Sequence, residues 1–465
     1  MTLARSTRLI QAVVILLAIA SGLVSVAPAQ VKEKVLYSFQ GGTSDGEYPA
    51  GGVVFDKAGN LYGATTDGGG ECPPAQCGIV FQLAPPAQKG DPWTETVLHI
   101  FQGPGSGDGN TPAGSVIIDS AGNLYGTTGY GGTGNCILLG TKVGCGAVYE
   151  LSPPAQKGGA WTETVLYSFP TPKQGYLPNG NLVFDSAGNL YGATMFGGGE
   201  GTTCDSYYQY CGAVFELSPP KKQGGAWTEK VLHGFAGIES GKISGDAAIP
   251  NGGLVLDAKG AIFGTTYAGG ISKCPPLFAE GCGTAFKLTP PTKKDGNWSA
   301  TLVHSFHRDA SDGGNPQAGV VIDKTLRVCG TTLNGGPGGY GTAFCLTPSS
   351  KESDPWNETI LYGFDDNNQY GADPVGGLTL GSHGHLYGTT NAFGADFGGT
   401  VFELNPKGTK WQISLLYGFT GPPDGEFPAA SLIFDKSGNL YSTSQAGGDG
   451  QACQSGCGTV YEISP

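Results

Sequence analysis

Residues 56–63 read Asp-Lys-Ala-Gly-Asn-Leu-Tyr-Gly, and this phrase recurs along the whole chain. The further copies lie at 119–126, 185–192, 257–264, 323–330, 381–388 and 435–442, with the clearest matches in the first two of these. Seven copies of one phrase define a repeat protein, and the repeat decides the fold before any local motif does. A residue present in every copy is therefore expected to build the repeat rather than to carry a unique function.

The first copy indicates four short strands. An apolar run at 52–55 precedes the aspartate turn, and strand-like runs follow at 61–65, 79–83 and 93–101. In the turn, Asp56 can accept backbone hydrogen bonds and Gly59 can supply a left-handed φ. Four antiparallel strands in a unit of roughly 62 residues have the size of a β-propeller blade. We therefore predict an all-β fold, a seven-bladed β-propeller with four antiparallel strands per blade.

The two ends of the chain complete this prediction. The seventh unit has only three strands, whereas residues 31–39 match the fourth strand of every other unit. We expect this N-terminal strand to close the last blade, which removes both free sheet edges. Each tryptophan stands eight residues before a strand-ending phenylalanine, so we assign all of them to the scaffold: Trp93, Trp161, Trp227, Trp298, Trp356 and Trp411.

Residues 1–29 have the pattern of a secretory signal peptide. Arg5 and Arg8 precede an apolar run at 9–19, and Ala27-Pro28-Ala29 fits a small-residue cleavage site. We therefore expect a secreted protein, extracellular or periplasmic, in which residues 30–465 form a single propeller domain. No later stretch is apolar enough to span a membrane.

The chain is acidic. Its formal charge is −13, and −15 without the two arginines of the N-terminal segment. Such a surface repels nucleic acid and anionic lipid, so we expect neither as a partner. We expect a monomer that has a glycan or a cell-surface molecule as its partner.

The cysteines fall into local pairs. An exported chain with 12 cysteines is typical of a disulfide-bonded protein. Paired CxxC motifs are absent and histidine is scarce, which disfavours a cysteine metal site. The predicted disulfides are Cys72–Cys77, Cys136–Cys145, Cys204–Cys211, Cys274–Cys282, Cys329–Cys345 and Cys453–Cys457.

Three motifs repeat together along the chain. They are the Gly-Leu-type first strand (residues 253–255 and 377–378), the Asp-x-x-Gly-Asn-Leu-Tyr-Gly-Thr-Thr phrase, and the Gly-Thr-Val-Phe-Glu-Leu-type third strand. In these motifs the chain resembles the bacterial GloVer tandem-repeat proteins. The resemblance covers nearly the whole chain after the signal peptide and implies a secreted or surface-displayed protein of undefined function. The aspartate turn is also similar to turns of NHL-type and lyase-type propellers, but this likeness brings no catalytic residue with it.

One chemical feature repeats on the face that carries the cysteine loops. A proline precedes each first strand, and in five repeats an aspartate stands four residues before it: Asp45, Asp108, Asp246, Asp312 and Asp424. A ring of carboxylates near the channel mouth could bind a cation or hydrogen-bond a sugar. Alternatively, each aspartate caps the backbone of its own turn.

Further candidates have equally simple alternatives. Three tyrosines in the third cysteine loop could contact a ligand or cover the loop's own disulfide: Tyr207, Tyr208 and Tyr210. Residues 365–369 are rich in Asp and Asn but lack the glycine and final glutamate of a calcium loop, so we expect no cofactor and leave calcium open. The GxGxxG matches at 129–134 and 336–341 precede strands rather than helices, which excludes a nucleotide site.

Histidine offers little chemistry in the sequence. Three histidines replace a strand tyrosine and are predicted to pack within the fourth strands: His99, His233 and His304. His383 and His385 form a His-x-His pair, but no third ligand is near them in sequence. The sequence therefore predicts no metal site.

Three functional hypotheses follow. The favoured one is a non-enzymatic secreted propeller that binds a glycan, a peptide or a surface partner through its variable loops, because no blade is chemically unique. The second is an extracellular polysaccharide lyase or hydrolase with carboxylates at the channel mouth. The third is a scaffold that binds no small ligand.

Overall fold

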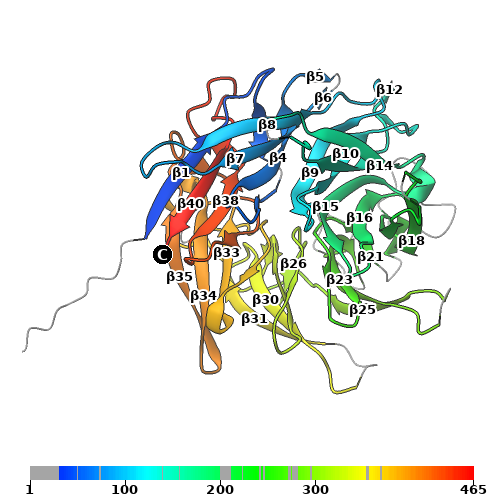
Figure 1. Cartoon of the computed structure of the whole chain (residues 1–465). Coiled ribbons are helices and arrows are strands. Elements are labelled where there is room, and N and C mark those ends of the chain that lie inside the picture. Colours follow the sequence, from blue (N-terminus) through cyan, green and yellow to red (C-terminus); the bar gives the residue numbers. More distant parts are fainter. Residues whose placement is uncertain are drawn as a thin grey trace, which may run out of the picture. The chain divides into compact units, whose positions relative to one another are not determined.

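The computed structural model describes residues 31–465 except 50, 73–74, 139, 157, 199–210, 223, 240–241, 244–246, 271–273, 275–280, 294–295, 352–355 and 367–368. Seven antiparallel sheets follow one another around a ring and form a seven-bladed β-propeller (Figure 1). Among the described residues there is no α-helix, and three 3-10 turns occur at η1 (Pro172–Gln174), η3 (Ser382–Gly384) and η4 (Ala395–Phe397). The predicted fold class is confirmed.

Each blade has four strands, counted from the channel outward. The first strands are β3 (Val54–Phe55) with β2 (Gly46–Pro49), β9 (Gly109–Ile118), β15 (Tyr176–Phe184), β22 (Val255–Leu256) with β21 (Ala247–Pro250), β27 (Val321–Ile322), β32 (Thr379–Leu380) and β37 (Ile433–Phe434). The second strands are β4 (Leu61–Gly68), β10 (Leu124–Gly131), β16 (Leu190–Phe196), β23 (Ile262–Gly269), β28 (Val328–Thr332), β33 (Leu386–Thr390) and β38 (Leu440–Ser444).

The outer half of each blade is equally regular. The third strands are β7 (Ile79–Ala84), β13 (Ala147–Ser152), β17 (Ala213–Ser218), β24 (Thr284–Thr289), β30 (Thr342–Thr347), β34 (Thr400–Lys407) and β40 (Thr459–Ser464). The fourth strands are β8 (Thr94–Ile100), β14 (Thr162–Ser168), β18 (Thr228–Gly234), β25 (Ser299–Ser305), β31 (Asn357–Gly363), β35 (Lys410–Gly418) and β1 (Lys32–Ser38). Short ribbons in the loops are β5 (Glu71–Cys72) with β6 (Ala75–Gln76), β11 (Ile137–Leu138) with β12 (Thr141–Lys142), β19 (Ile238–Glu239) with β20 (Lys242–Ile243), β26 (Gly313–Gly314) with β29 (Asn334–Gly335), and β36 (Gly425–Glu426) with β39 (Ala446–Gly447).

The repeated phrase forms the turn between the first and second strands. Asp56 Oδ1 accepts hydrogen bonds from the backbone amides of Ala58 (2.8 Å) and Asn60 (2.9 Å). Its Oδ2 accepts from the hydroxyl of Tyr62 at 3.1 Å, so the turn also fixes a tyrosine of the next strand. The same bonds recur at Asp119, Asp185 and Asp435. The phrase is therefore a structural turn, which explains why it repeats.

The N-terminal strand closes the ring. Strand β1 pairs antiparallel with β40, in a register that runs from Lys32 opposite Ser464 to Ser38 opposite Thr459. Figure 1 shows these two strands, blue and red, side by side. Because β1 takes the place of a fourth strand, the last blade has the same strand order as the others, as the sequence predicts.

An aromatic pair lies in every seam between neighbouring blades. The phenylalanine that ends a fourth strand packs on the third-strand aromatic ring of the next blade, with centroids 4.9–5.2 Å apart. The pairs are Phe39–Phe81, Phe101–Tyr149, Phe169–Phe215, Phe235–Phe286, Phe306–Phe344, Phe364–Phe402 and Phe419–Tyr461. Each such pair contributes about 0.5–1.5 kcal/mol beyond the area it buries.

The tryptophans pack in the same seams. Trp161 lies against Tyr62 of the preceding blade with ring centroids 5.9 Å apart, and Trp356 lies against Phe263 at 5.8 Å. These contacts agree with the scaffold role that their spacing predicts.

A backbone hydrogen bond also crosses every seam. The residue before each repeated proline has a left-handed φ of 53–59°, and its amide donates to a loop carbonyl of the preceding blade over 2.6–3.1 Å. The seven donor–acceptor pairs are Tyr48–Cys457, Thr111–Cys77, Leu177–Cys145, Ile249–Cys211, Asn315–Cys282, Asp373–Tyr340 and Phe427–Gly398. In five seams the acceptor is a loop cysteine, so the cysteine loops are part of the joint between blades.

The proline itself presses on a glycine of the preceding blade. A Cβ placed on Gly78 would lie 2.4 Å from Cδ of Pro112. In the other six seams, the corresponding distance between the added Cβ and the proline Cδ is 2.3–2.8 Å. Only glycine fits there, because real carbon atoms do not approach so closely and the φ of Gly78 is +77°.

A matched pair of substitutions tests this seam contact. Gly59 has a similar φ of +90° but no atom within 4 Å of an added Cβ, so G59A carries the backbone cost alone, about 1 kcal/mol. We expect G78A to lower the free energy of unfolding by about 1–3 kcal/mol more, because its methyl group overlaps Pro112 of the next blade and the carbonyl oxygen of Thr65. Urea unfolding of both variants measures the difference, and equal losses would show that the contact does not constrain the seam.

Candidate functional site

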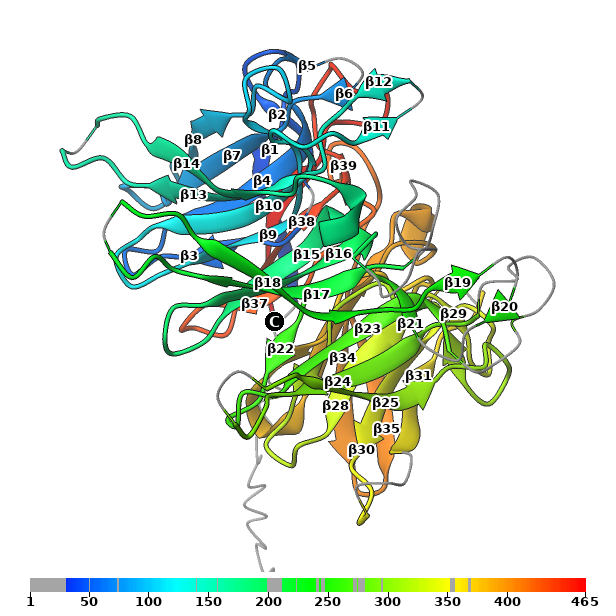
Figure 2. The ribbon, with the colours of Figure 1, turned by 90° about the vertical axis from the view of Figure 1, so that its right-hand side faces the viewer.

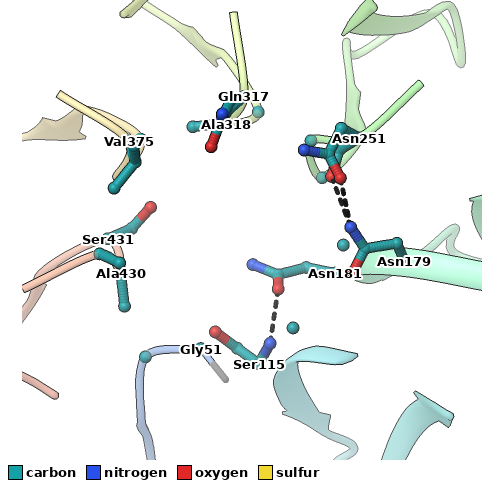
Figure 3. A pocket seen from close by; sticks show the side chains of 18 of the residues that line it. Gly51, Ser115, Asn179, Asn181, Asn251, Gln317, Ala318, Val375, Ala430 and Ser431 are labelled. Atoms are coloured by element: carbon teal, nitrogen blue, oxygen red, sulfur yellow. Dashed lines mark hydrogen bonds between the residues drawn. The ribbon is translucent and has the colours of Figure 1, made fainter. Parts of the chain in front are cut away.

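A pocket of about 490 Å³ lies where the first strands of all seven blades begin (Figure 3). No charged side chain is among the described residues that line it. Three adjacent blades contribute the amide side chains of Asn179, Asn251 and Gln317, at the position directly after the repeated proline. The next two blades contribute Val375 and Ala429 at the same position. At this position the rim is therefore polar in three adjacent blades and apolar in the next two, where Asn391 and Gln445 add amide groups from positions directly after the second strands.

The amides of the polar part of the rim are held in place by hydrogen bonds. Asn179 Nδ2 donates to Oδ1 of Asn251 on the neighbouring blade. Asn181 Oδ1 accepts a hydrogen bond from the backbone amide of Ser115 at 2.7 Å. This leaves the amide nitrogen of Asn181 directed into the pocket, as Figure 3 shows. The polar groups are thus oriented before any ligand arrives.

Glycine makes much of the rest of the rim. A Cβ on Gly51 would lie 2.3 Å from the backbone nitrogen of Ser115, and one on Gly252 would lie 2.3 Å from the carbonyl carbon of Ala318. The first strands therefore approach one another backbone to backbone. This close approach brings peptide groups as well as side chains to the pocket wall.

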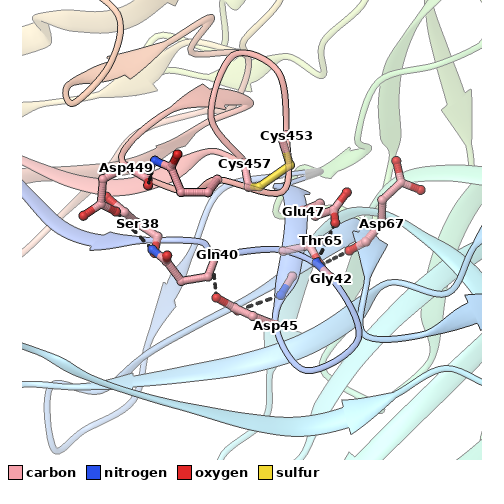
Figure 4. Close-up of a disulfide and its surroundings, with 12 residues drawn as sticks. Ser38, Gln40, Gly42, Asp45, Glu47, Thr65, Asp67, Asp449, Cys453 and Cys457 are labelled. Carbon is pink, nitrogen blue, oxygen red and sulfur yellow. Dashed lines mark hydrogen bonds between the residues drawn. A yellow bond between two sulfur atoms is a disulfide. The ribbon is translucent and has the colours of Figure 1, made fainter.

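The cysteine loops follow the second strands, whereas the pocket lies where the first strands begin. In an antiparallel blade these two points are at the same end, so the cysteine loops lie at the end that carries the pocket. The loop disulfides described in full are Cys136–Cys145, Cys274–Cys282 and Cys453–Cys457, the last drawn in Figure 4. Cys329–Cys345 is also present, but it joins paired residues of strands β28 and β30 and does not lie in a loop. Cys77 and Cys211 are disulfide-bonded as well. The side chains of their predicted partners, Cys72 and Cys204, lie outside the described residues. Figure 2 shows the loop ribbons β11–β12 and β19–β20 on one side of the ring.

Four of the five predicted aspartates are described, and they lie in the seams and not in the pocket wall. Asp45 accepts hydrogen bonds from the hydroxyl of Tyr37 (2.9 Å) and from the amides of Gln40 (2.7 Å) and Gly46 (2.6 Å; Figure 4). Asp108, Asp312 and Asp424 accept from a tyrosine or histidine and from the backbone in the same way. This geometry is that of the turn-cap alternative, and ligand binding by these residues stays a prediction. Asp246 lies outside the described residues, as do Tyr207, Tyr208 and Tyr210.

A set of seam glutamates was missed by the sequence analysis. They occupy one position of the fourth strands, and each has one buried carboxyl oxygen without a hydrogen-bond partner: Glu33, Glu95, Glu163, Glu229 and Glu358. Burial, followed by the nearby charge of Asp45, raises the pKa of Glu95 from 4.5 to about 7. The sequence did carry a signal for these residues: in five blades, the second residue of the fourth strand is a glutamate.

The histidines divide into seam residues and a turn pair. His99 Nε2 lies 3.1 Å from Asp108 Oδ2, and the ring packs on Phe101 with centroids 4.8 Å apart, which agrees with the predicted strand packing. In the His-x-His pair, His385 Nδ1 lies 2.8 Å from Oε1 of Glu403. No metal-ligating group of three within the described ranges includes this pair. The run at 365–369 is described only in part, so calcium there stays open.

A second hollow of about 970 Å³ lies at the opposite end of three blades. Its wall includes the aspartate turns at 56–59, 119–122 and 435–437 together with Trp93. The carboxylates of these turns already hold their own backbone, as described for Asp56. We therefore regard the channel pocket as the better candidate site.

The model of the Gloeobacter/Verrucomicrobia repeat family matches residues 19–278 and 277–465. The chain belongs to this family. The resemblance inferred from the repeated motifs is thereby confirmed. A comparison with curated proteins found no match.

Solved structures resemble this chain in fold. A fungal alcohol oxidase of the AA5 family, in complex with copper, is 15% identical over 94% of this chain and 76% of its own, with a TM-score of 0.51. A "putative 6-phosphogluconolactonase" from Bacteroides fragilis NCTC 9343 is 14% identical over 86% of this chain and 88% of its own, with a TM-score of 0.45. At such identities the likeness concerns the fold alone. No helix of the described part is long and apolar enough to cross a membrane.

The seam glutamates predict how stability depends on pH. Because burial raises the pKa of Glu33, Glu95 and Glu163 to about 7, the neutral acid is favoured in the folded state. This contribution is fully present below pH 4.5 and is lost as the pH rises through 7. We therefore expect the free energy of unfolding to fall from pH 5 to pH 8.

The substitution E95Q imitates the neutral acid, so this variant should reduce the fall in unfolding free energy between pH 5 and pH 8 by about 1 kcal/mol after allowance for solvent screening. D91N, which removes an exposed carboxylate, is the control and should leave the slope as it is. Urea unfolding at several pH values between 5 and 8 measures both. A wild-type stability that rises from pH 5 to pH 8 would contradict the account.

Proposed function

We propose that this protein is a secreted, non-enzymatic binding protein that recognises a neutral, hydroxyl-rich ligand, a glycan, at the mouth of the central channel. The observation that carries the proposal is the rim of amides, hydroxyls and backbone groups without a charged side chain. The four described disulfides are consistent with an extracellular protein, which supports the secretion part of the proposal.

The chemistry of the rim matches that of a sugar. Sugar hydroxyls both donate and accept hydrogen bonds, and amide side chains offer both functions in one group. Asn181, Asn251 and Gln317 can therefore bind hydroxyls without charge. Val375 and Ala429 across the pocket give the ligand's C–H surface an apolar contact. Binding sites commonly combine an apolar surface with a few oriented polar groups in this way.

The overall charge supports a neutral ligand. A formal charge of −13 repels anionic molecules, and no cationic side chain among the described lining residues offsets it. A ligand that depends on carboxylate or phosphate groups would therefore find no counter-charge at the rim. We expect neutral glycans to bind better than acidic ones.

An extracellular polysaccharide lyase or hydrolase is the second candidate. It is favoured by the carboxyl pairs of the seams, where a glutamate with raised pKa faces an aspartate, as with Glu163 and Asp108. A protonated acid beside a carboxylate is a donor set for acid–base catalysis. Release of reducing ends or of unsaturated products from a polysaccharide by the purified protein would support this function instead.

Substitutions in the rim test the binding proposal. A glycan array identifies a neutral ligand, and calorimetry then measures its affinity. We expect N251A and Q317A each to weaken binding by about 10-fold or more, because each removes hydrogen bonds to the ligand. S437A, at the opposite end of the blades, is the control and should bind like the wild type.

Two outcomes would contradict the proposal. One is the absence of binding to any neutral glycan on the array. The other is normal affinity in N251A and Q317A together with lost affinity in D45N and D108N, which would move the site to the carboxylates that the sequence analysis proposed.

A further inference from the structure

Among the seams whose residues are all described, one differs in its chemistry. Between the fourth and fifth blades, His304 of β25 faces Asp312 of the connector and Glu358 of β31. His304 Nε2 lies 3.2 Å from Asp312 Oδ2 and 4.0 Å from Glu358 Oε2. One ligand atom from each of the three residues lies within 4.8 Å of the other two.

Two carboxyl oxygens in this cluster are buried without a hydrogen-bond partner. They are Oδ1 of Asp312, a residue only 5% exposed, and Oε1 of Glu358. The other seam glutamates share the second feature, so Oδ1 of Asp312 is the one that sets this seam apart. A buried polar atom without a partner costs free energy. Asp312 also departs from its repeat, since the corresponding oxygen of Asp45, Asp108 and Asp424 accepts a hydrogen bond from the next glycine amide.

We propose that His304, Asp312 and Glu358 bind a divalent transition-metal ion, for which Zn²⁺ is the representative. Imidazole and carboxylate ligands together suit zinc and its neighbours rather than calcium or magnesium. Around tetrahedral zinc, with bonds of about 2.0–2.2 Å, two ligand atoms lie about 3.3 Å apart. His304 Nε2 and Asp312 Oδ2, which share a hydrogen bond of 3.2 Å, already lie at this spacing, and a small movement of the Glu358 side chain completes the set.

His307 acts as a positioning residue for this site. Its Nδ1 lies 2.8 Å from Asp312 Oδ2, and its backbone amide donates to the same oxygen at 2.9 Å. Such contacts hold a ligating carboxylate in the orientation that the metal needs. With three protein ligands, the ion retains a fourth position for water or an external ligand.

The site spans two blades. His304 belongs to the outer strand of the fourth blade, whereas Glu358 belongs to the outer strand of the fifth. A bound ion would therefore link the two blades at the outer edge of the ring. Metal binding to the folded state alone raises the midpoint of thermal unfolding.

The repeat supplies matched variants. Tyr37 and Tyr417 stand at the position of His304 in other seams, and Gln40 and Gln102 stand at the position of His307. H304Y and H307Q therefore introduce residues that the fold already accepts. The seam of His99, Asp108 and Glu163 has the same imidazole but Gln102 in place of the second histidine, so H99Y is the control.

The experiment is calorimetric titration of the chelator-treated protein with ZnCl₂, without reducing agent so that the cysteines stay in disulfides. We expect one saturable site with a dissociation constant in the micromolar range or below, and a higher thermal midpoint with zinc. H304Y should weaken binding about 100-fold or more, and H307Q about 10- to 100-fold. H99Y should bind like the wild type.

Three results would overturn the proposal. The first is that the wild type shows no saturable binding at about 100-fold molar excess of zinc. The second is that H304Y binds zinc with unchanged affinity. The third is that H385A, a variant of the turn pair, loses zinc binding while H304Y retains it. Circular dichroism checks that each variant is folded. If H304Y does not fold, E358Q decides, because unchanged affinity in that variant contradicts the assigned ligand set.

Discussion

The structure depends on a joint that every blade makes with the next. A residue with left-handed φ donates its amide to a loop carbonyl of the preceding blade, and the proline that follows presses on a glycine of that same loop. The donor must hold an unfavourable backbone conformation, which persists only where the surroundings impose it. Because the joint recurs in all seven seams, it fixes the angle between blades, closes the ring and anchors the cysteine loops.

The same joint determines what the channel can present. In five blades the residue after the proline lies at the rim, so the joint delivers its side chain to a fixed place. The next position is glycine in five blades, where backbones meet, and alanine in the other two, as Ala318 and Ala430. The position after the proline is free to vary, and here it carries Asn179, Asn251 and Gln317 on one arc. Ligand-binding side chains can therefore vary at the positions that the repeat leaves unconstrained, while the repeated contacts keep the blade backbone rigid.

Much of the fold could be predicted from the sequence, and little of the site. Blade number and the closing strand at 31–39 follow from spacing alone, since each copy is a local unit. The place of Asp45 could not be predicted, because its partners Tyr37 and Gln40 depend on how the connector folds back. Contacts such as that of His304 with Glu358 join residues almost one repeat apart across a seam, and no local pattern encodes the distance between two blades.

Native-state hydrogen exchange measures the seam joint most directly. The amides to follow are those of the seven residues before the repeated prolines, because each is the donor of one joint. If the joint holds the ring together, these amides exchange as slowly as those of the central strands, and all seven open together with β1. Exchange of these amides at the rate of exposed turn amides, while the strands stay protected, would contradict the account.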